Sequence, residues 1–188
     1  MTNEPHDLGP MPTDRSLKTV DELVVNAPAA RIFALAADVE GWPTHLPHYR
    51  YVRFVERRAD GGGTVEMSAN RPFGPLDWPT WWTSLMSVRT PSSTVRGAIR
   101  FRHIHGVTAG MDVEWTFDPH EAGTRVRIVH VWNGPPWPVI GEIAAHGVIG
   151  PVFVHGIASR TLAGLGRVAE RNRDAAPGVA SSSEVSSG

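Results

Sequence analysis

The sequence contains no cysteine among its 188 residues, and this absence excludes several kinds of site. A disulfide framework, a zinc–thiolate centre and a thiol nucleophile all require cysteine. A surplus of charge is also lacking, because 18 Lys and Arg against 19 Asp and Glu give a net charge of −1. Non-specific nucleic-acid binding usually shows a basic surplus, so the composition argues against it. The length fits one domain.

A long hydrophobic run is missing as well. The most apolar stretch, Val139–Val154, is interrupted by Glu142, His146 and Pro151. It is shorter than the roughly 20 residues that a membrane span needs. The polar N-terminus shows neither the basic nor the apolar region of a signal peptide. We therefore expect a cytoplasmic protein with no integral membrane segment.

Both ends have compositions that are typical of disordered tails. Residues 1–16 are rich in Pro, Asp and Asn, and residues 174–188 are mostly Ser, Gly and Ala. Neither segment can bury enough apolar surface to offset the entropy lost on ordering. The sequence therefore predicts one folded domain over residues 17–173.

The hydrophobic pattern of this domain changes from strand to helix, then to a series of strands, and back to helix. A strand at 18–25 precedes a helix that Pro28 begins and a second short helix at 39–46. Six further strands are predicted at 49–58, 63–70, 77–89, 94–105, 111–117 and 124–132. Short connections between consecutive strands are typical of an antiparallel meander.

A helical region that begins near Pro136 and Pro138 closes the domain. Its last part carries a stripe at helical spacing, formed by Phe153, Ile157, Thr161, Leu165 and Val168. The fold class is therefore α+β, with a curved antiparallel sheet of about seven strands wrapped around a long C-terminal helix. A ligand cavity commonly remains between such a sheet and its helix.

Three motifs point to a known family. They are Asn26-Ala27-Pro28 followed by Ile32-Phe33, then Asp38-Val39-Glu40-Gly41-Trp42-Pro43 with Tyr49 after it, and finally Gly110–Phe117. In this order they resemble the START-like (SRPBCC) superfamily, and within it the tetracenomycin-type aromatase/cyclases of the polyketide cyclase/dehydrase group. The resemblance covers about residues 18–172 and implies a helix-grip fold. One departure is that Met86 stands where those enzymes carry a cavity arginine.

Large inward side chains are the candidates for the cavity wall. Alternation on the strand at 77–89 places Trp82, Ser84 and Met86 on one face and Trp81 on the other. The resemblance adds Trp42 at the cavity mouth. Alternation on the last two strands adds three more candidates, which are Met111, Trp115 and Trp132. Plain filling of the core is the alternative role for all of these residues.

Three histidines also fall on predicted inward faces. His103 and His105 share one parity on their strand, and His130 alternates with apolar residues on a neighbouring strand. Together they could ligate a metal ion, but no carboxylate is placed to support them, and we predict no metal site. The opposite parity places Arg100 and Arg102 on a solvated face, which Arg125 and Arg127 share.

Two residues are the candidates for proton transfer. The resemblance places Tyr49 at the cavity mouth, where a phenol can hydrogen-bond a carbonyl and act as a general acid. A buried neutral His130 can act as a general base on an acidic α-carbon. A half-buried phenol and a core histidine are the alternatives.

These observations predict a protein that binds a hydrophobic polyketide-like or aromatic molecule and assists its aldol cyclisation and dehydration without a cofactor. The expected partners are that small molecule and an acyl carrier protein that presents it, but no nucleic acid. The chain is expected to be a monomer or a homodimer. A non-catalytic carrier of a quinone, lipid or other apolar metabolite is the main alternative, and a ligand-sensing module is a third.

Overall fold

Seven antiparallel strands form one curved sheet in the computed structural model, which describes residues 8–73, 76–134 and 155–171. The strands are β1 (Leu17–Val25), β2 (Tyr49–Arg57), β3 (Gly63–Phe73), β4 (Leu76–Arg89), β5 (Ala98–Gly106), β6 (Asp112–His120) and β7 (Gly123–Trp132). Their order across the sheet is β1-β7-β6-β5-β4-β3-β2. Consecutive strands from β2 to β7 are therefore neighbours, and the predicted meander is confirmed.

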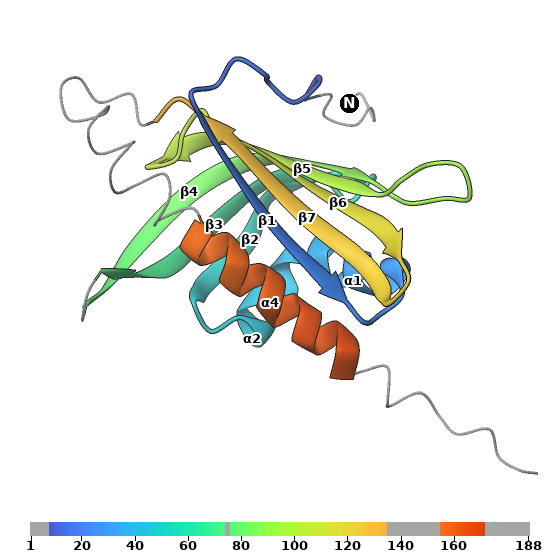
Figure 1. Cartoon of the computed structure of the whole chain (residues 1–188). Coiled ribbons are helices and arrows are strands. Elements are labelled where there is room, and N and C mark those ends of the chain that lie inside the picture. The colour runs from blue at the N-terminus through green and yellow to red at the C-terminus, as the bar shows by residue number, and fades with distance from the viewer. Residues whose placement is uncertain (1–7, 74–75, 135–154, 172–188) are drawn as a thin grey trace, which may run out of the picture.

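One long helix lies against the inner face of this sheet, as Figure 1 shows. This helix, α4 (His155–Arg171), packs against β1 and against α1 (Ala29–Ala37). The 3-10 turn η1 (Val39–Gly41) and the short helix α2 (Trp42–His45) follow α1 and lie on the same side of the sheet (Figure 1). The predicted α+β helix-grip fold is confirmed.

The helices bury the side chains that their periods predict. Pro28 is the N-cap of α1, with φ of −61° and an extended ψ of 144°, so the helix begins one residue later than predicted, at Ala29. Three apolar residues of α1 are buried, namely Ile32, Phe33 and Ala36. In α4 the stripe residues from Thr161 onward are also buried. These stripes hold both helices on the inner face of the sheet.

The strand β5 begins four residues later than the alternation predicts, at Ala98. The Ser92 hydroxyl accepts the backbone N–H groups of Thr94 and Val95, so this stretch forms a turn and not a strand. The predicted helix start at Pro136 and Pro138, the stripe residue Phe153, the apolar run at 139–154, residues 1–7 and the tail at 174–188 lie outside the described residues. In the part of the chain that is described, no helix is both long and apolar enough to cross a membrane.

Residues 8–16 contact the sheet, although the sequence predicted a disordered tail there. Leu8 is only 6% exposed, and Arg102 Nη2 donates to its carbonyl at 2.9 Å. Arg100 Nη1 donates to the carbonyl of Gly9. In Figure 1 this segment lies on the side of the sheet opposite α4. The amino end of the described chain therefore covers part of the outer face.

These contacts also correct the prediction that Arg100 lies on a solvated face, whereas the side chain of Arg102 is 38% exposed and remains partly solvated. The side chain of Arg100 is 13% exposed, and its Nη2 lies 3.7 Å from Asp112 Oδ1. Arg102 Nη2 lies 2.9 Å from the same oxygen. Asp112 is buried, so the two guanidinium groups offset the cost of removing its carboxylate from water. Parity gave the correct face but could not show what covers it.

Candidate functional site

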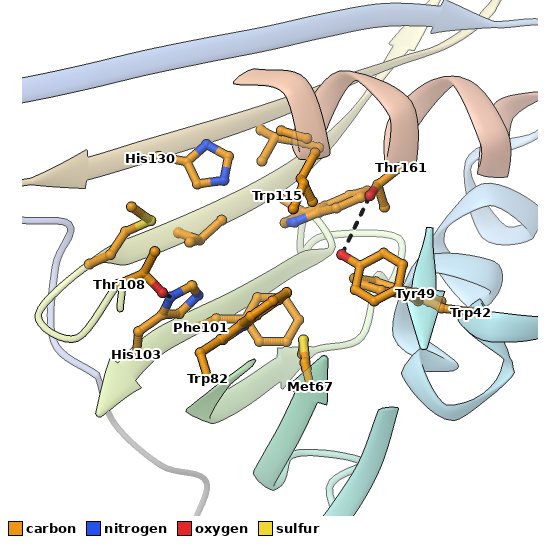
Figure 2. Close-up of a pocket in the computed structure, with 15 residues that line it drawn as sticks. Trp42, Tyr49, Met67, Trp82, Phe101, His103, Thr108, Trp115, His130 and Thr161 are labelled. Atoms are coloured by element: carbon orange, nitrogen blue, oxygen red, sulfur yellow. Dashed lines mark hydrogen bonds between the residues drawn. The ribbon is translucent and has the colours of Figure 1, made fainter. Parts of the chain in front are cut away.

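A cavity of about 70 Å³ lies between the inner face of the sheet and the first half of α4 (Figure 2). Its lining comes from α2, α4, the β5–β6 loop and every strand except β1. The lining residues are Trp42, Tyr49, Met67, Trp82, Phe101, His103, Thr108, Met111, Val113, Trp115, Ile128, His130, Ile157, Ala158 and Thr161. None of them is Asp, Glu, Lys or Arg, so the polar groups of this lining are hydroxyl, imidazole and indole groups.

The structure brings seven of the sequence-selected residues together in this lining. They are Trp42, Tyr49, Trp82, His103, Met111, Trp115 and His130. Each of them comes from a different helix, strand or loop. Their meeting follows from the curvature of the sheet, because inward residues of successive strands converge on the space under α4.

Trp42 is the centre of the aromatic wall. Its ring centroid lies 5.2 Å from that of Tyr49, 6.4 Å from that of Phe101 and 5.8 Å from that of Trp115. The indole Nε1 also donates to the carbonyl of Leu35 at 3.1 Å, which ties α2 to the end of α1. Aromatic pairs of this kind stabilise a fold by about 0.5–1.5 kcal/mol each. The wall therefore has a fixed shape.

Trp82 and His103 form a second flat surface in the cavity. Their ring centroids are 5.9 Å apart, and the ring planes meet at 23°. His103 Nδ1 lies 2.6 Å from the hydroxyl oxygen of Thr108, which is buried in the loop between β5 and β6. This contact fixes the orientation of the imidazole ring against the indole.

Ser84 and Met86 are fully buried, as the alternation of β4 predicts, but they do not line the cavity. Met86 lies four residues beyond Trp82 on β4, where it pairs with Gly63 of β3 and Phe101 of β5. Both side chains are part of the core between the sheet and the helices. Neither residue is therefore part of the described cavity wall, where the sequence predicted both.

A β-bulge turns His105 away from the cavity. Thr83 pairs with His105, but the next residue of β4, Ser84, pairs with His103, so Ile104 is an extra residue on β5. An extra residue reverses the face on which the following side chain lies. His105 is exposed, whereas His103 lines the cavity, and the prediction that both face inward is corrected.

Trp132 has the predicted inward parity but lies beyond the cavity lining. It is 3% exposed, and its Nε1 donates to the carbonyl of Ala109 at 3.0 Å. The indole thus anchors the β5–β6 loop, which carries Thr108 and leads to Met111. Trp132 therefore fixes the loop that contributes Thr108 and Met111 to the lining and is not itself part of it.

His130 faces the cavity from β7. Its Nδ1 lies 3.3 Å from the hydroxyl oxygen of Thr19, the residue that pairs with it on β1. The imidazole of His130 is thus one of the polar groups of the cavity wall and is held from β1.

The hydroxyl of Tyr49 lies against α4, as the dashed line in Figure 2 shows. Thr161 Oγ1 donates a hydrogen bond to it at 3.4 Å. The same Oγ1 lies 3.1 Å from Nε2 of His48. Burial, with a smaller contribution from the positive charge of Arg160, lowers the pKa of His48 from its usual 6.5 to about 4. The imidazole is therefore neutral at pH 7.

Sequence reasoning did not select the other eight lining residues as site residues. They are Met67, Phe101, Thr108, Val113, Ile128, Ile157, Ala158 and Thr161. A signal existed for Thr161, because it is the one hydroxyl in the otherwise apolar stripe of the last helix. His48, which contacts Thr161 from outside the lining, shows no such signal in the sequence.

No three side chains of His, Cys, Asp or Glu within the described ranges gather closely enough to hold a metal ion. The bulge at Ile104 places His105 and His103 on opposite faces of the sheet, so the two imidazoles of the His-x-His pair cannot bind one ion together.

Comparison with known proteins relates both the sequence and the fold to one family. A family model described as polyketide cyclase/dehydrase and lipid transport matches residues 25–148. The chain belongs to this family. Among solved structures, the Zhui aromatase/cyclase from Streptomyces sp. R1128 is 21% identical with a TM-score of 0.69. That match covers 86% of this chain and 98% of the other.

Two further solved structures have the same fold as this polyketide cyclase/dehydrase family member. A protein from Thermus thermophilus is 19% identical, with a TM-score of 0.67 and coverage of 85% of this chain and 99% of its own. A START superfamily protein from Mycobacterium smegmatis is 16% identical, with a TM-score of 0.60 and coverage of 84% and 99%. The START-like resemblance that the motifs carry is confirmed.

Proposed function

We propose that this family member binds a hydrophobic aromatic or polyketide-like molecule in the cavity and assists its cyclisation and dehydration. The observation that carries the proposal is that two proton-transfer groups, Tyr49 and His130, lie in the wall of a largely apolar cavity. The absence of formally charged residues from the described lining favours an uncharged ligand.

Each of these groups suits one part of an intramolecular aldol reaction. The His130 imidazole removes a proton from a carbon between two carbonyls, and the resulting enolate attacks a third carbonyl of the same chain. A new C–C bond forms, and the Tyr49 hydroxyl donates its proton to the oxygen of the attacked carbonyl. In the dehydration, the Tyr49 phenolate removes a second α-proton while protonated His130 gives its proton to the departing hydroxyl. One water leaves and both residues regain their starting states.

Enclosure supplies the remaining assistance. Holding the reacting carbons of one chain close together lowers the barrier by about 7 kcal/mol or more in favourable intramolecular cases. The cavity of about 70 Å³ is small beside the roughly 300–1,000 Å³ of pockets for drug-sized ligands. A polyketide chain therefore requires lining side chains to move, and Met67 and Met111 have the unbranched, flexible chains that allow this. An acyl carrier protein is the partner that we propose to present such a chain.

The proposal is tested with a synthetic poly-β-ketone thioester, whose cyclised products are followed by chromatography. Tyr49→Phe and His130→Gln should each slow cyclisation by roughly 10²-fold, the usual scale of general acid–base assistance, with little change in affinity. Tyr51→Phe and His105→Gln are matched controls because both residues are exposed and lie outside the lining. Wild-type rates in both site variants would contradict the assignment.

A non-catalytic carrier of a quinone, lipid or similar metabolite is the second candidate function. The observation that favours it is the buried Met86 at the position where the resemblance predicts a cavity arginine. If the protein is such a carrier, the wild type binds the poly-β-ketone but leaves the rate and the product distribution of its spontaneous cyclisation unchanged.

A further inference from the structure

Three polar side chains in hydrogen-bond contact cross the wall of the cavity next to α4. Tyr49 and Thr161 line the cavity, and His48 lines a separate surface groove of about 560 Å³ between α4 and the loop that precedes β2. Thr161 lies between the other two, 3.4 Å from the Tyr49 oxygen and 3.1 Å from His48 Nε2. The phenol that the proposed reaction uses as an acid is thus connected to a histidine outside the cavity.

The directions of these hydrogen bonds follow from the number of protons available. A threonine hydroxyl has one proton, and Thr161 donates it to the oxygen of Tyr49. Thr161 Oγ1 can then only accept from His48, which assigns the neutral imidazole to the tautomer with its proton on Nε2. The Tyr49 oxygen is an acceptor in this arrangement, and its own proton is directed to another atom.

The surroundings of His48 keep it in the neutral form. Burial and the charge of Arg160 lower its pKa to about 4. The groove also contains His45 and Arg167, and none of its described lining residues is acidic. On the inner side the imidazole ring packs on the Tyr49 ring, with centroids 4.8 Å apart. Burial and the nearby guanidinium of Arg160 therefore disfavour a second proton on the ring.

We propose that His48 is a positioning residue for Tyr49: it holds the Thr161 hydroxyl so that the latter donates to the phenolic oxygen and stabilises the phenolate left after proton donation. This inference rests on the proposed function, in which Tyr49 is the acid. The described cavity lining contains no lysine or arginine that could stabilise a phenolate by charge. A hydrogen bond to a charged oxygen is stronger than one to a neutral oxygen, so the contact favours the ionised state selectively.

The first test needs no substrate. The chain has two tyrosines, so labelling with ¹³C at tyrosine Cζ in a Tyr51→Phe background leaves the single signal of Tyr49. Thr161→Val is nearly isosteric and should move the ionisation of Tyr49 upward by about one pH unit. His48→Leu should move it in the same direction by less, because the threonine keeps its proton but loses its orientation. Thr161→Ser and the exposed-residue control His45→Gln should leave the titration unchanged.

The second test uses the poly-β-ketone reaction. Thr161→Val and His48→Leu should lower kcat roughly tenfold with KM unchanged, whereas Thr161→Ser should retain the wild-type kcat. Equal ionisation of Tyr49 in the wild type, Thr161→Val and His48→Leu would overturn the inference, even if Tyr49→Phe abolishes turnover. A shifted ionisation in a protein whose wild type does not accelerate cyclisation would instead overturn the proposed function and support the hydrogen-bond role of His48.

Discussion

Trp82 stacks on His103 across β4 and β5, with the ring planes at 23° and the ring centroids 5.9 Å apart. The stack lies directly beside the β-bulge at Ile104, which leaves His103 as the inward histidine of β5. The neighbouring Trp81 points to the outer face and is 53% exposed. Two adjacent tryptophans thus belong to opposite sides of the sheet, one in the cavity and one in solvent.

This arrangement predicts different effects for the two tryptophans. Trp82→Leu removes one aromatic wall and should weaken binding of a flat aromatic ligand such as anthraquinone by roughly tenfold. It should also reduce the quenching of tryptophan fluorescence when the ligand binds. Trp81→Leu makes the same chemical change on the outer face and should alter neither property. Fluorescence titration of the two variants measures both, and equal affinities would place the ligand elsewhere.

The segment that begins at Leu8 should contribute to stability. Deleting residues 1–11 exposes the outer face and removes the two backbone carbonyls that accept from Arg100 and Arg102, so the free energy of unfolding should fall by about 1–3 kcal/mol. Urea denaturation measures this change. Deletion of residues 1–7 is the control, because it leaves Leu8 and its contacts in place. Equal stability of the two truncated chains would show that the contacts of Leu8 and Gly9 contribute nothing.

Two glycines of α4 should respond in opposite ways to replacement by alanine. A Cβ at Gly156 meets no atom within 4 Å, so Gly156→Ala should stabilise the helix by as much as about 1 kcal/mol. A Cβ at Gly164 would overlap the buried side chain of Leu46. Gly164→Ala should therefore lower the melting temperature in spite of the same gain in helix propensity. Stabilisation by both changes would mean that the loop at Leu46 moves without cost.

The dependence of stability on pH should carry the signature of His48. Its folded-state pKa of about 4 lies below the usual 6.5. Between these two pH values the imidazole of His48 is protonated in the unfolded chain but neutral in the folded chain. The contribution of His48 to the free energy of unfolding is therefore complete above pH 6.5 and is lost as the pH falls to about 4. For a half-buried group the loss should be on the order of 2 kcal/mol.

His48→Gln should remove this component, whereas the exposed His45→Gln should retain it. Urea denaturation at several pH values between 7 and 4 gives, for each variant, the slope of the free energy of unfolding against pH. The comparison uses the slope and not the stability at one pH, because His48→Gln also changes the hydrogen bond to Thr161. Identical slopes would contradict the lowered pKa.

The fold was predictable from the sequence because alternation survives wherever one face of a strand is buried. Val113, Trp115 and Phe117 alternate with polar residues on β6, and all three are buried. The inward orientation of Trp82 followed from the same rule. The rule depends on an unbroken pleat, however, and the extra residue at Ile104 has no counterpart in the hydrophobic pattern. In the structure Gly106 ends β5 with φ of 92°, a conformation that glycine adopts readily.

The site was less predictable because parity gives the face of a side chain but not its position along the cavity. Met86 and Trp132 both have the inward parity. Met86 is nevertheless buried in the core, and Trp132 is buried where its indole donates to the carbonyl of Ala109 in the β5–β6 loop. The contact between His48 and Thr161 joins residues 113 positions apart, which no local pattern encodes. The contact of Leu8 with the sheet involves Arg102 of β5, a residue distant in the sequence, and local patterns could not predict it either.

The attachment of Leu8 and Gly9 to Arg102 and Arg100 also fixes where anything fused to the amino end departs from the domain. That departure point lies on the side of the sheet opposite α4 (Figure 1). A fluorescent label attached at Gly9 therefore lies across the sheet from the helix face that covers the cavity. Such a label reports on the outer face and leaves α4 and the surface groove beside it unmodified.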